Sequence, residues 1–376
     1  MSLRDIIVDE IRRQGPMPFS RYMELCLYHP ELGYYSRPVE QFGKAGDFYT
    51  SSDVHAVFGR LLARQFEEMW RLLDSPERID LIELGPGRGL FARDVLDWSA
   101  KRFPDFAGPL RYGLVEQSPV LRTRLQERLS DHLAAGRATV FETLESAASP
   151  ADQYLIVFAN EFFDALPVEV VDHRGSVRVV EKEGMLSEQF VPCVPSELEF
   201  LDRYGVHSEE GERVEVPLAS VGWMERIAAA FQGRQGFAIV IDYGYTREQQ
   251  LAGRHRDTLL TYRRHRANPS PYEAPGEQDI TAHVNFTALR SIAEENGMKP
   301  LALLTQSQFL IGAGEATQFA DAFQDCRLPQ ERAKVALQLK HLISPEGMGE
   351  SFQVLVMSHG VSSEKAARLS GLRLSR

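Results

Sequence analysis

The sequence predicts an α/β fold of the Rossmann-like type, in which helices cover a mostly parallel sheet. Three observations indicate this fold. An apolar strand at residues 79–84 leads into a glycine-rich turn at 85–89, and apolar residues then recur at helical spacing over 90–98. A strand, a tight glycine turn and a helix form the opening unit of nucleotide-binding sheets. The apolar runs 154–159 and 236–242 have the composition of strands that are buried on both faces, as in parallel sheets.

The remaining elements follow from the same periodicities along the chain. Apolar residues three and four apart predict helices, and alternating or continuous apolar runs predict strands. The further predicted helices lie at residues 2–14, 19–28, 54–73, 119–129, 218–231 and 286–296. The further predicted strands lie at residues 110–116, 138–142, 168–172, 177–181, 301–306 and 351–357. Ser20 is the expected N-cap of the second helix, and the turn at 173–176 predicts a hairpin.

These elements divide the chain into three parts. We expect an N-terminal helical layer with a cofactor-covering loop at 1–74, and the core at 75–357. The core carries an insertion with a β-hairpin at about 168–235 and a lid at about 250–285. Irregular loops of that length in compact proteins are usually functional or disordered. The tail at 358–376 is basic and is expected to be frayed.

Composition excludes several classes of protein. With 43% apolar residues, the chain can fill a large core. Its net charge of −11 argues against nonspecific nucleic-acid binding, which needs a basic surface. The three cysteines are scattered, so we expect neither a disulfide framework nor a metal site. We expect a reducing compartment, and the bacterial cytoplasm is the predicted location. We find no run of 18 apolar residues that would span a membrane and no signal or transit segment.

The turn after the first strand carries glycine at every second position. Gly85, Gly87 and Gly89 let the chain turn tightly and approach a ligand closely, because glycine has no Cβ. The following helix directs unpaired N–H groups toward that ligand. A dinucleotide pattern that starts at Gly85 fails at Leu90, although a shifted match that ends in alanine keeps this alternative open. The acid Glu83 followed by the three glycines resembles the first motif of class I S-adenosylmethionine-dependent methyltransferases.

Further polar residues follow the other predicted strands. Glu116 ends the second strand, where an acid can accept hydrogen bonds from the ribose hydroxyls of a nucleotide. The buried strand 154–159 runs directly into two acids and two aromatic residues within 160–167. Open α/β sheets bind their ligands at this end of their strands, and buried acids are costly without a function. The alternative is that Asn160 and Asp164 only cap the chain and form a turn after the strand.

Two loops add candidate contacts. The polar loop that precedes the helix at 54–73 caps that helix, or it places Gly46, Asp47, Thr50 and Ser51 over the cofactor. The lid contains a basic cluster at 263–266, which is unusual in an acidic chain. This cluster is either a solvated loop or a site that captures an acidic group.

Several motifs occur in an order that resembles the MidA-like family of S-adenosylmethionine-dependent methyltransferases. This family includes the mitochondrial protein arginine methyltransferase that assists assembly of respiratory complex I. The motifs are Gly46-Asp47-Phe48-Tyr49-Thr50-Ser51, Glu83-Leu84-Gly85-Pro86-Gly87-Arg88-Gly89, Ala159-Asn160-Glu161-Phe162-Phe163-Asp164-Ala165-Leu166-Pro167, Ile241-Asp242-Tyr243-Gly244 and Asp279-Ile280-Thr281-Ala282-His283-Val284. The resemblance covers residues 4 to 357, and Ser52-Asp53 departs mildly from the Pro-Glu that is common in the family.

The resemblance implies a class I methyltransferase fold with a seven-stranded, mostly parallel sheet. It implies S-adenosyl-L-methionine over the Gly85–Gly89 turn, with Glu116 at the ribose and an arginine of a protein as substrate. The expected cofactor-binding residues are Gly46, Asp47, Thr50, Ser51, Glu83, Gly85, Gly87, Gly89, Glu116 and Asn160. The expected substrate-binding residues are Phe162, Phe163, Asp242, Tyr243, Arg263 and His283. We expect a protein substrate, which the resemblance extends to a respiratory-complex subunit, and the oligomeric state stays open, with a homodimer as one alternative.

The chemistry of arginine favours Glu161 and Asp164 as the catalytic residues. A guanidinium is permanently charged and is a poor nucleophile. Carboxylates beside it would orient it and offset the positive charge of a nearby sulfonium. Two other functions stay open from the sequence: an assembly chaperone that binds S-adenosylmethionine with little turnover, and a nicotinamide-dependent oxidoreductase.

Overall fold

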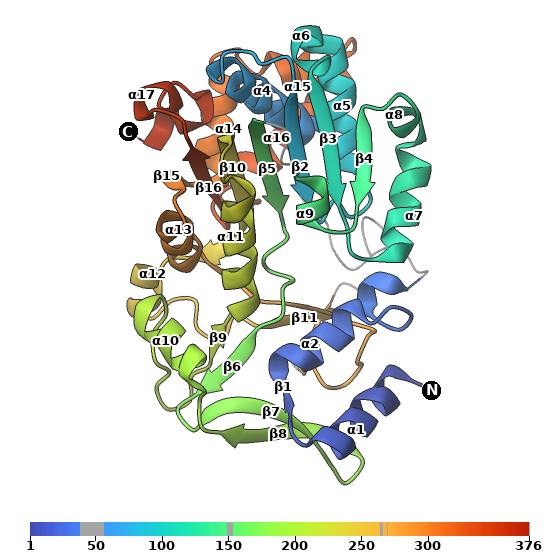
Figure 1. Cartoon of the computed structure of the whole chain (residues 1–376), viewed down its shortest axis with the longest axis vertical. Coiled ribbons are helices and arrows are strands. Elements are labelled where there is room, and N and C mark those ends of the chain that lie inside the picture. Colours follow the sequence, from blue (N-terminus) through green and yellow to red (C-terminus); the bar gives the residue numbers. More distant parts are fainter. Residues whose placement is uncertain (38–55, 149–152, 264–265, 269, 376) are drawn as a thin grey trace. The chain divides into compact units, whose positions relative to one another are not determined.

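A computed structural model describes residues 1–37, 56–148, 153–263, 266–268 and 270–375 (Figure 1). The chain forms two compact units. Unit 1 consists of Met1–Tyr49, Phe162–Met224 and Gly244–Ile292, and unit 2 consists of Thr50–Glu161, Glu225–Tyr243 and Ala293–Arg376. Across the described ranges we find no helix with the length and hydropathy of a membrane span.

Unit 2 holds the strands of the predicted parallel sheet and most of the helices. Its strands are β2 (Ile79–Leu84), β3 (Leu110–Val115), β4 (Ala138–Phe141), β5 (Tyr154–Asn160), most of β10 (Gln235–Tyr245), β15 (Lys299–Thr305) and β16 (Phe352–His359). Its helices are α4 (Ala56–Leu72), α5 (Leu90–Arg102), α6 (Pro104–Ala107), α7 (Pro119–Arg128), α8 (Ser130–Ala134), α9 (Leu144–Ala147), α14 (Gln306–Glu315), α15 (Ala320–Phe323), α16 (Pro329–Ile343), α17 (Ser363–Ala366) and the 3-10 helix η2 (Ser370–Ser375).

The sheet of unit 2 has the strand order β15-β16-β10-β5-β2-β3-β4. Strand β16 runs antiparallel to both of its neighbours, and the other pairs along this path are parallel. This path confirms the predicted seven-stranded, mostly parallel sheet, and the short β14 (Val284–Asn285) adds an eighth strand to the end of β10. From β2 the chain proceeds to β3 and β4 on one side, and then to β5 and β10 on the other. The strand order therefore reverses between β2 and β5, which is where open α/β sheets bind their ligands.

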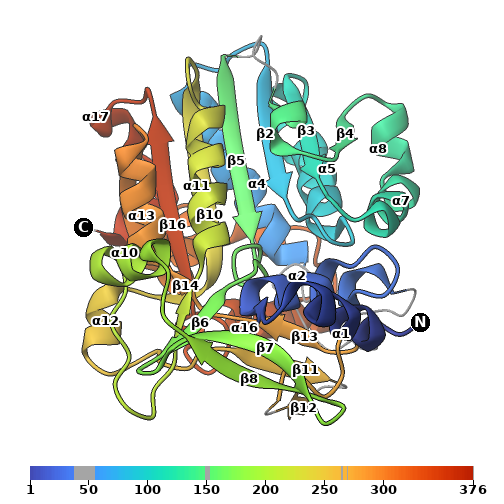
Figure 2. The same cartoon turned by 60° about the horizontal axis from the view of Figure 1, so that its bottom comes forward.

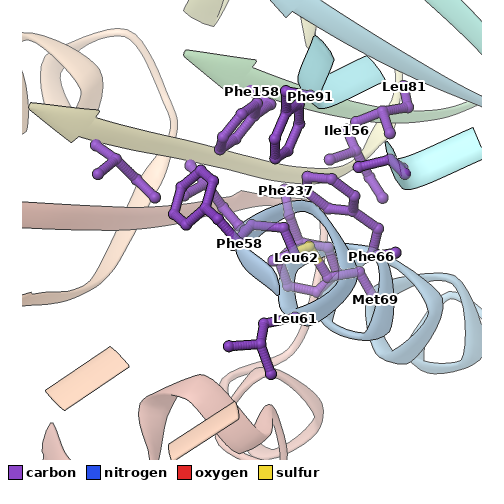
Figure 3. Close-up of a cluster of buried hydrophobic side chains, with 14 of the residues drawn as sticks. Phe58, Leu61, Leu62, Phe66, Met69, Leu81, Phe91, Ile156, Phe158 and Phe237 are labelled. Atoms are coloured by element: carbon purple, nitrogen blue, oxygen red, sulfur yellow. The ribbon is translucent and has the colours of Figure 1, made fainter. Parts of the chain in front are cut away.

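The core of unit 2 lies between the sheet and helices α4 and α5. Phe58 and Phe66 of α4 contact Phe91 of α5, and Phe91 stacks on Phe158 of β5 with 4.5 Å between ring centroids. Figure 3 shows these rings with the aliphatic side chains of α4, β2 and β5 around them. Fully burying one such ring contributes about 2–3 kcal/mol. The cluster therefore holds the strand tips and the first turn of α5 in a fixed relation.

Unit 1 has two smaller sheets and a core of its own. One sheet has the order β1-β7-β6-β9 with β8 on β7, and the other has the order β12-β11-β13. The strands are β1 (Met17–Pro18), β6 (Glu169–Asp172), β7 (Gly175–Lys182), β8 (Met185–Val191), β9 (Val214–Val216), β11 (Leu260–Arg263), β12 (Arg266–Asn268) and β13 (Asp279–Thr281). The helices are α1 (Leu3–Gln14), α2 (Phe19–Tyr28), η1 (Tyr34–Ser36), α10 (Pro195–Arg203) and α12 (Arg247–Leu251).

Within unit 1, helices α1 and α2 pack on β7 (Figure 2). Two more helices, α11 (Leu218–Ala230) and α13 (Phe286–Glu295), contribute residues to both units. Thus segments far apart in sequence build each unit. The domain boundaries that we drew from the sequence stay a prediction.

Differences from the predicted elements concern the cap of α2, the region 250–285 and the tail. Ser20 does not cap α2: Pro18 is the N-cap, and the Ser20 hydroxyl donates to Glu169 instead. The region 250–285, expected to be irregular, contains α12 and strands β11 to β14. The tail is not frayed, because α17 and η2 bury Leu369 and Leu372.

Candidate functional site

The glycine turn after β2 has a backbone conformation that favours glycine. Gly85, Gly87 and Gly89 have φ values of +62°, +52° and +72°, in the left-handed region. A Cβ on Gly87 would meet no described atom within 4 Å, whereas a Cβ on Gly89 would lie 2.7 Å from Leu125 Cδ2. A side chain at position 89 would displace the end of Leu125 and strain the backbone, so both favour glycine there, and among the described residues position 87 leaves the backbone open to a ligand.

Helix α5 begins directly after this turn. Gly89 is its N-cap, and within the described residues no side-chain hydrogen bond caps the first N–H groups. These groups are left to solvent or to a ligand, and they carry the positive end of the dipole of a 13-residue helix. The turn thus has the two properties that nucleotide-binding turns need, close backbone approach and unpaired donors.

Glu116 follows the last residue of β3, which adjoins β2 in the sheet. It is 9% exposed, and the Ser118 backbone N–H donates to its Oε1 at 2.8 Å. Burial raises the pKa of Glu116 to about 7, although the backbone hydrogen bond from Ser118 opposes this shift. A carboxylate with a fixed orientation at this strand tip can accept hydrogen bonds from ribose hydroxyls.

Glu83 has a partner inside the fold. It is 5% exposed, and the Tyr112 hydroxyl donates to its Oε2 at 2.8 Å. Burial raises its pKa to about 8, and the Tyr112 hydrogen bond opposes the shift. The contact with Tyr112 links β2 to β3. The predicted contact of Glu83 with the cofactor stays a prediction.

The variant Glu83→Gln is expected to gain stability over the wild type at high pH. Folded Glu83 keeps its proton up to about pH 8, whereas the carboxyl of the unfolded chain loses it near pH 4.5. The folded state therefore binds more protons across this window, so the wild type loses stability as pH rises through it. We expect the variant's advantage in free energy of unfolding to grow by roughly 4 kcal/mol between about pH 5 and about pH 9. Denaturant titrations at both pH values measure it, and an equal difference at both would contradict this account.

Asn160 ends the central strand β5 at the reversal of strand order, and Glu161 follows it. Asn160 Nδ2 donates to Glu161 Oε1 at 3.1 Å, and the buried Asn160 Oδ1 accepts no hydrogen bond within the described chain. Glu161 has a φ of +50°, a conformation that costs a residue other than glycine about 1 kcal/mol or more. Its N–H donates to Ile241 O of β10 at 2.9 Å, which holds it in place. A strained acid beside an unsatisfied amide is typical of a ligand-binding site.

The strand predicted at 236–242 would place Asp242 and Tyr243 at its end, but both residues lie inside β10. Strand β10 extends to Tyr245 because β14 pairs with Gly244 and Tyr245. Asp242 is fully buried and accepts the Tyr243 backbone N–H at 2.9 Å. The Tyr243 ring contacts Phe352 of β16 with 3.9 Å between centroids. Both residues directly follow Ile241, whose backbone O accepts the Glu161 N–H.

Phe162, Phe163 and Asp164 belong to unit 1. The Phe162 ring packs edge-on against Trp223 at 4.9 Å, and Phe163 is 2% exposed. Asp164 is buried, and burial raises its pKa to about 7. Its backbone O accepts the Ala282 N–H at 3.0 Å, which ties it to the segment after β13. Trp223 was not a sequence candidate, since it lies in a helix without a recognisable motif.

His283 pairs with a second histidine, His255, within unit 1. Its Nδ1 lies 3.2 Å from His255 Nδ1, and burial lowers its pKa to about 4, with His255 adding to the shift. The ring is therefore neutral at physiological pH. Arg263 is the last residue of β11, but its side chain lies outside the described residues. Residues Gly46, Asp47, Thr50 and Ser51 also lie outside the described residues, so their predicted roles stay predictions.

Comparisons with known proteins agree with this geometry. Residues 61–304 match the family model Methyltransf_28, which describes S-adenosyl-L-methionine-dependent methyltransferases. The mitochondrial protein arginine methyltransferase NDUFAF7 homolog of Drosophila melanogaster is 28% identical, over 94% of this chain and 84% of its own. The human protein arginine methyltransferase NDUFAF7 is 27% identical, over 93% of this chain and 81% of its own.

A solved structure extends the match to the whole fold. A protein from Burkholderia thailandensis, crystallised with S-adenosyl-homocysteine, has a TM-score of 0.82 and 29% identity. The match covers 99% of this chain and 94% of that protein. The nicotinamide alternative is therefore dropped, and the cofactor is S-adenosyl-L-methionine. The chain belongs to the Methyltransf_28 family of S-adenosyl-L-methionine-dependent methyltransferases.

Proposed function

We propose that this methyltransferase acts on an arginine side chain of a protein substrate. The observation that carries the proposal is Glu161, a strained acid directly after the central strand, followed three residues later by Asp164. The relatives named as protein arginine methyltransferases support it, because they match more than nine tenths of this chain. Catalytic roles for Glu161 and Asp164 are part of the proposal.

The residues of unit 2 fit the cofactor. Among the described residues, Gly87 leaves open space where a side chain would block a ligand, and Asn160 Oδ1 is a buried acceptor without a donor. We propose that these two residues, Gly85, Gly89 and Glu116 hold S-adenosyl-L-methionine. Bound S-adenosyl-L-methionine supplies a methyl group on a positively charged sulfonium. The protein then has to align the acceptor and offset positive charge.

The proposed carboxylates suit a guanidinium acceptor. Glu161 and Asp164 would each accept N–H hydrogen bonds and orient one guanidinium nitrogen toward the methyl group. The raised pKa of Asp164, about 7, leaves it partly protonated at neutral pH while no cation is near. A guanidinium would favour the ionised form and lower this pKa. The carboxylate could then receive the proton that the methylated nitrogen releases.

The finer assignments belong to the same proposal. Phe162, Phe163, Asp242, Tyr243, Arg263 and His283 are proposed to line the path of the substrate. We also propose membership of the MidA-like branch and a respiratory-complex subunit as one candidate substrate. The bacterial cytoplasm is the proposed location, and its support is that Cys26, Cys193 and Cys326 are all free thiols.

Radiolabelled S-adenosyl-L-methionine tests the substrate class. The purified protein is incubated with lysate from a strain that lacks the gene, and labelled proteins are hydrolysed to amino acids. We expect the label in methylarginine. Label in another amino acid would contradict the arginine assignment, and no labelled protein would favour the chaperone alternative.

A further inference from the structure

A cavity lies in unit 2 on one face of β2, β3 and β4. It has a volume of about 210 Å³. The strand register places Ile82, Gly113 and Thr139 in one row across the three strands, so these residues lie on the same face. Because Gly113 has no side chain, the row has a hollow centre: a Cβ there would lie 3.5 Å from both Ile82 and Phe141.

Helix α9 forms a wall of this cavity. It packs on all three strands, as Figure 1 shows, and Ser146 and Ala147 of its second half line the space. Glu145 of the same helix is bound by Arg226, at 2.7 and 2.8 Å. The cavity therefore has fixed apolar and polar walls made from the sheet and one anchored helix.

The rim of the cavity is strongly basic. Among the described residues, Arg78, Arg111 and Arg137 line it together with a single acid, Asp80. Three positive charges against one negative charge leave a formal charge of +2, in a chain whose net charge is −11. Such a concentration would attract an anion, since a cavity lined by one sign of charge focuses the field.

Two of these guanidinium groups have donors to spare. Arg111 uses Nη1 for the carbonyl oxygens of Gly108 and Leu110, at 3.1 and 3.0 Å, and its other nitrogens make no further bond within the described chain. The exposed guanidinium of Arg137 has no hydrogen-bond or ion-pair partner in the described ranges. Arg78 Nε lies 4.0 Å from Asp80 Oδ1, so Arg78 offsets the charge of this acid.

We propose that this cavity binds the phosphate group of a small molecule. Several guanidinium N–H groups and the Thr139 hydroxyl can donate to the three or four oxygens of a phosphate, whereas a carboxylate ligand would offer only two oxygens. The apolar floor of Ile82 and Phe141 offers a surface for a small organic body. The volume lies below the roughly 300 Å³ at which pockets for drug-sized ligands begin. The phosphate is either free or part of a mononucleotide, which share this chemistry.

This site is distinct from the cofactor turn. Asp80 lies near the start of β2, and Gly85 follows the end of that strand. Five residues of extended chain span about 17 Å. The inference does not depend on the proposed substrate of the methyltransferase, and binding to the cavity can be measured apart from methyl transfer.

Calorimetric titration of the full chain in low salt tests the proposal, with inorganic phosphate and AMP as separate ligands. Arg111→Ala/Arg137→Ala should weaken binding of both by at least about tenfold, because it removes the donors without partners. The matched control is Arg102→Ala/Arg327→Ala, which removes the same charge from exposed positions of unit 2 and should stay within about twofold of the wild type. Affinity for S-adenosyl-L-methionine should be unchanged in both variants, which shows that they fold.

The outcomes separate the alternatives. Tighter binding of AMP than of phosphate would support the site and place a nucleoside on the apolar floor, and equal binding would support the phosphate group alone. Equal losses in the two double variants would overturn the proposal, since net charge would explain the binding. No saturable binding of either ligand would also overturn it. So would an acidic peptide that binds more tightly than both, because the cavity would then serve a protein partner.

Discussion

Replacing Gly87 with valine is expected to weaken S-adenosyl-L-methionine binding by at least about 100-fold, or about 2.7 kcal/mol. Gly87 has a φ of +52°, and no atom of the described residues lies within 4 Å of the place where its Cβ would stand. A valine side chain would occupy the surface on which the cofactor has to approach the backbone. Calorimetric titration with S-adenosyl-L-methionine measures the loss.

Gly233 provides a matched control for this substitution. It lies in the same unit, has a φ of +75°, and its Cβ position likewise has no neighbour within 4 Å in the part of the chain that the structure describes. Gly233→Val carries a similar backbone strain, about 1–2 kcal/mol, but lies in the turn after α11. It should bind the cofactor like the wild type. Equal losses of affinity in both variants would mean that backbone strain explains the effect, and not a side chain that blocks the cofactor from the backbone at position 87.

Glu161→Gln is expected to lower the rate of methyl transfer by about 100-fold or more, while cofactor affinity changes little. Glutamine keeps the size of the side chain and an oxygen that can accept from Asn160 Nδ2, as Glu161 does. It removes the charge that would orient a guanidinium and stabilise positive charge in the transition state. The rate of labelled methyl incorporation into the protein substrate, measured alongside S-adenosyl-L-methionine titration, checks both parts.

Glu183 is the matched control for this second substitution. It is also a glutamate with a left-handed backbone, φ +51°, and it lies exposed between β7 and β8 of unit 1. Glu183→Gln should keep the full rate. Asp164→Asn, which removes the second proposed carboxylate, should also lower the rate. If Glu161→Gln and Asp164→Asn both transferred methyl groups at the wild-type rate with cofactor still bound, the proposed guanidinium site would be wrong.

The strand-turn-helix unit was predictable from the sequence because its signals are local. Glycines at every second position and an apolar strand of six residues identify β2, the turn and α5 without distant partners. The hairpin of β6 and β7 was predictable for the same reason, and its strands pair at Val171 and Ser176. Sites on such local units are the ones that a single sequence indicates best.

The elements that the sequence missed depend on distant pairing. Strand β11 pairs with β13, and Leu260 faces Thr281 across a loop rich in proline. No local pattern encodes that register. The tail looked frayed because it is short and basic, but the Gly371 N–H donates to Gln65 Oε1 at 2.9 Å, more than 300 residues earlier in the sequence.

The same limit applies to individual site residues. His283 was a candidate for substrate binding, but its partner His255 lies 28 residues earlier. The sequence spacing of the two histidines is not one that is typical of metal ligands. Trp223 meets Phe162 only through the fold of unit 1. The phosphate cavity draws on three strands and a helix, so its arginines look unrelated in the sequence. Residues gain these roles from strand register and packing, which one sequence does not display.

Quantitative mass spectrometry of arginine methylation in cells tests the central claim most directly. A strain that lacks the gene is compared with strains that carry the wild type, Gly87→Val or Gly233→Val. We predict that at least one protein loses methylarginine on deletion, and that the wild type and Gly233→Val restore it but Gly87→Val does not. An arginine-methylated proteome that is unchanged by deletion, or fully restored by Gly87→Val, would contradict the assignment of this chain as a protein arginine methyltransferase that works through the Gly85–Gly89 turn.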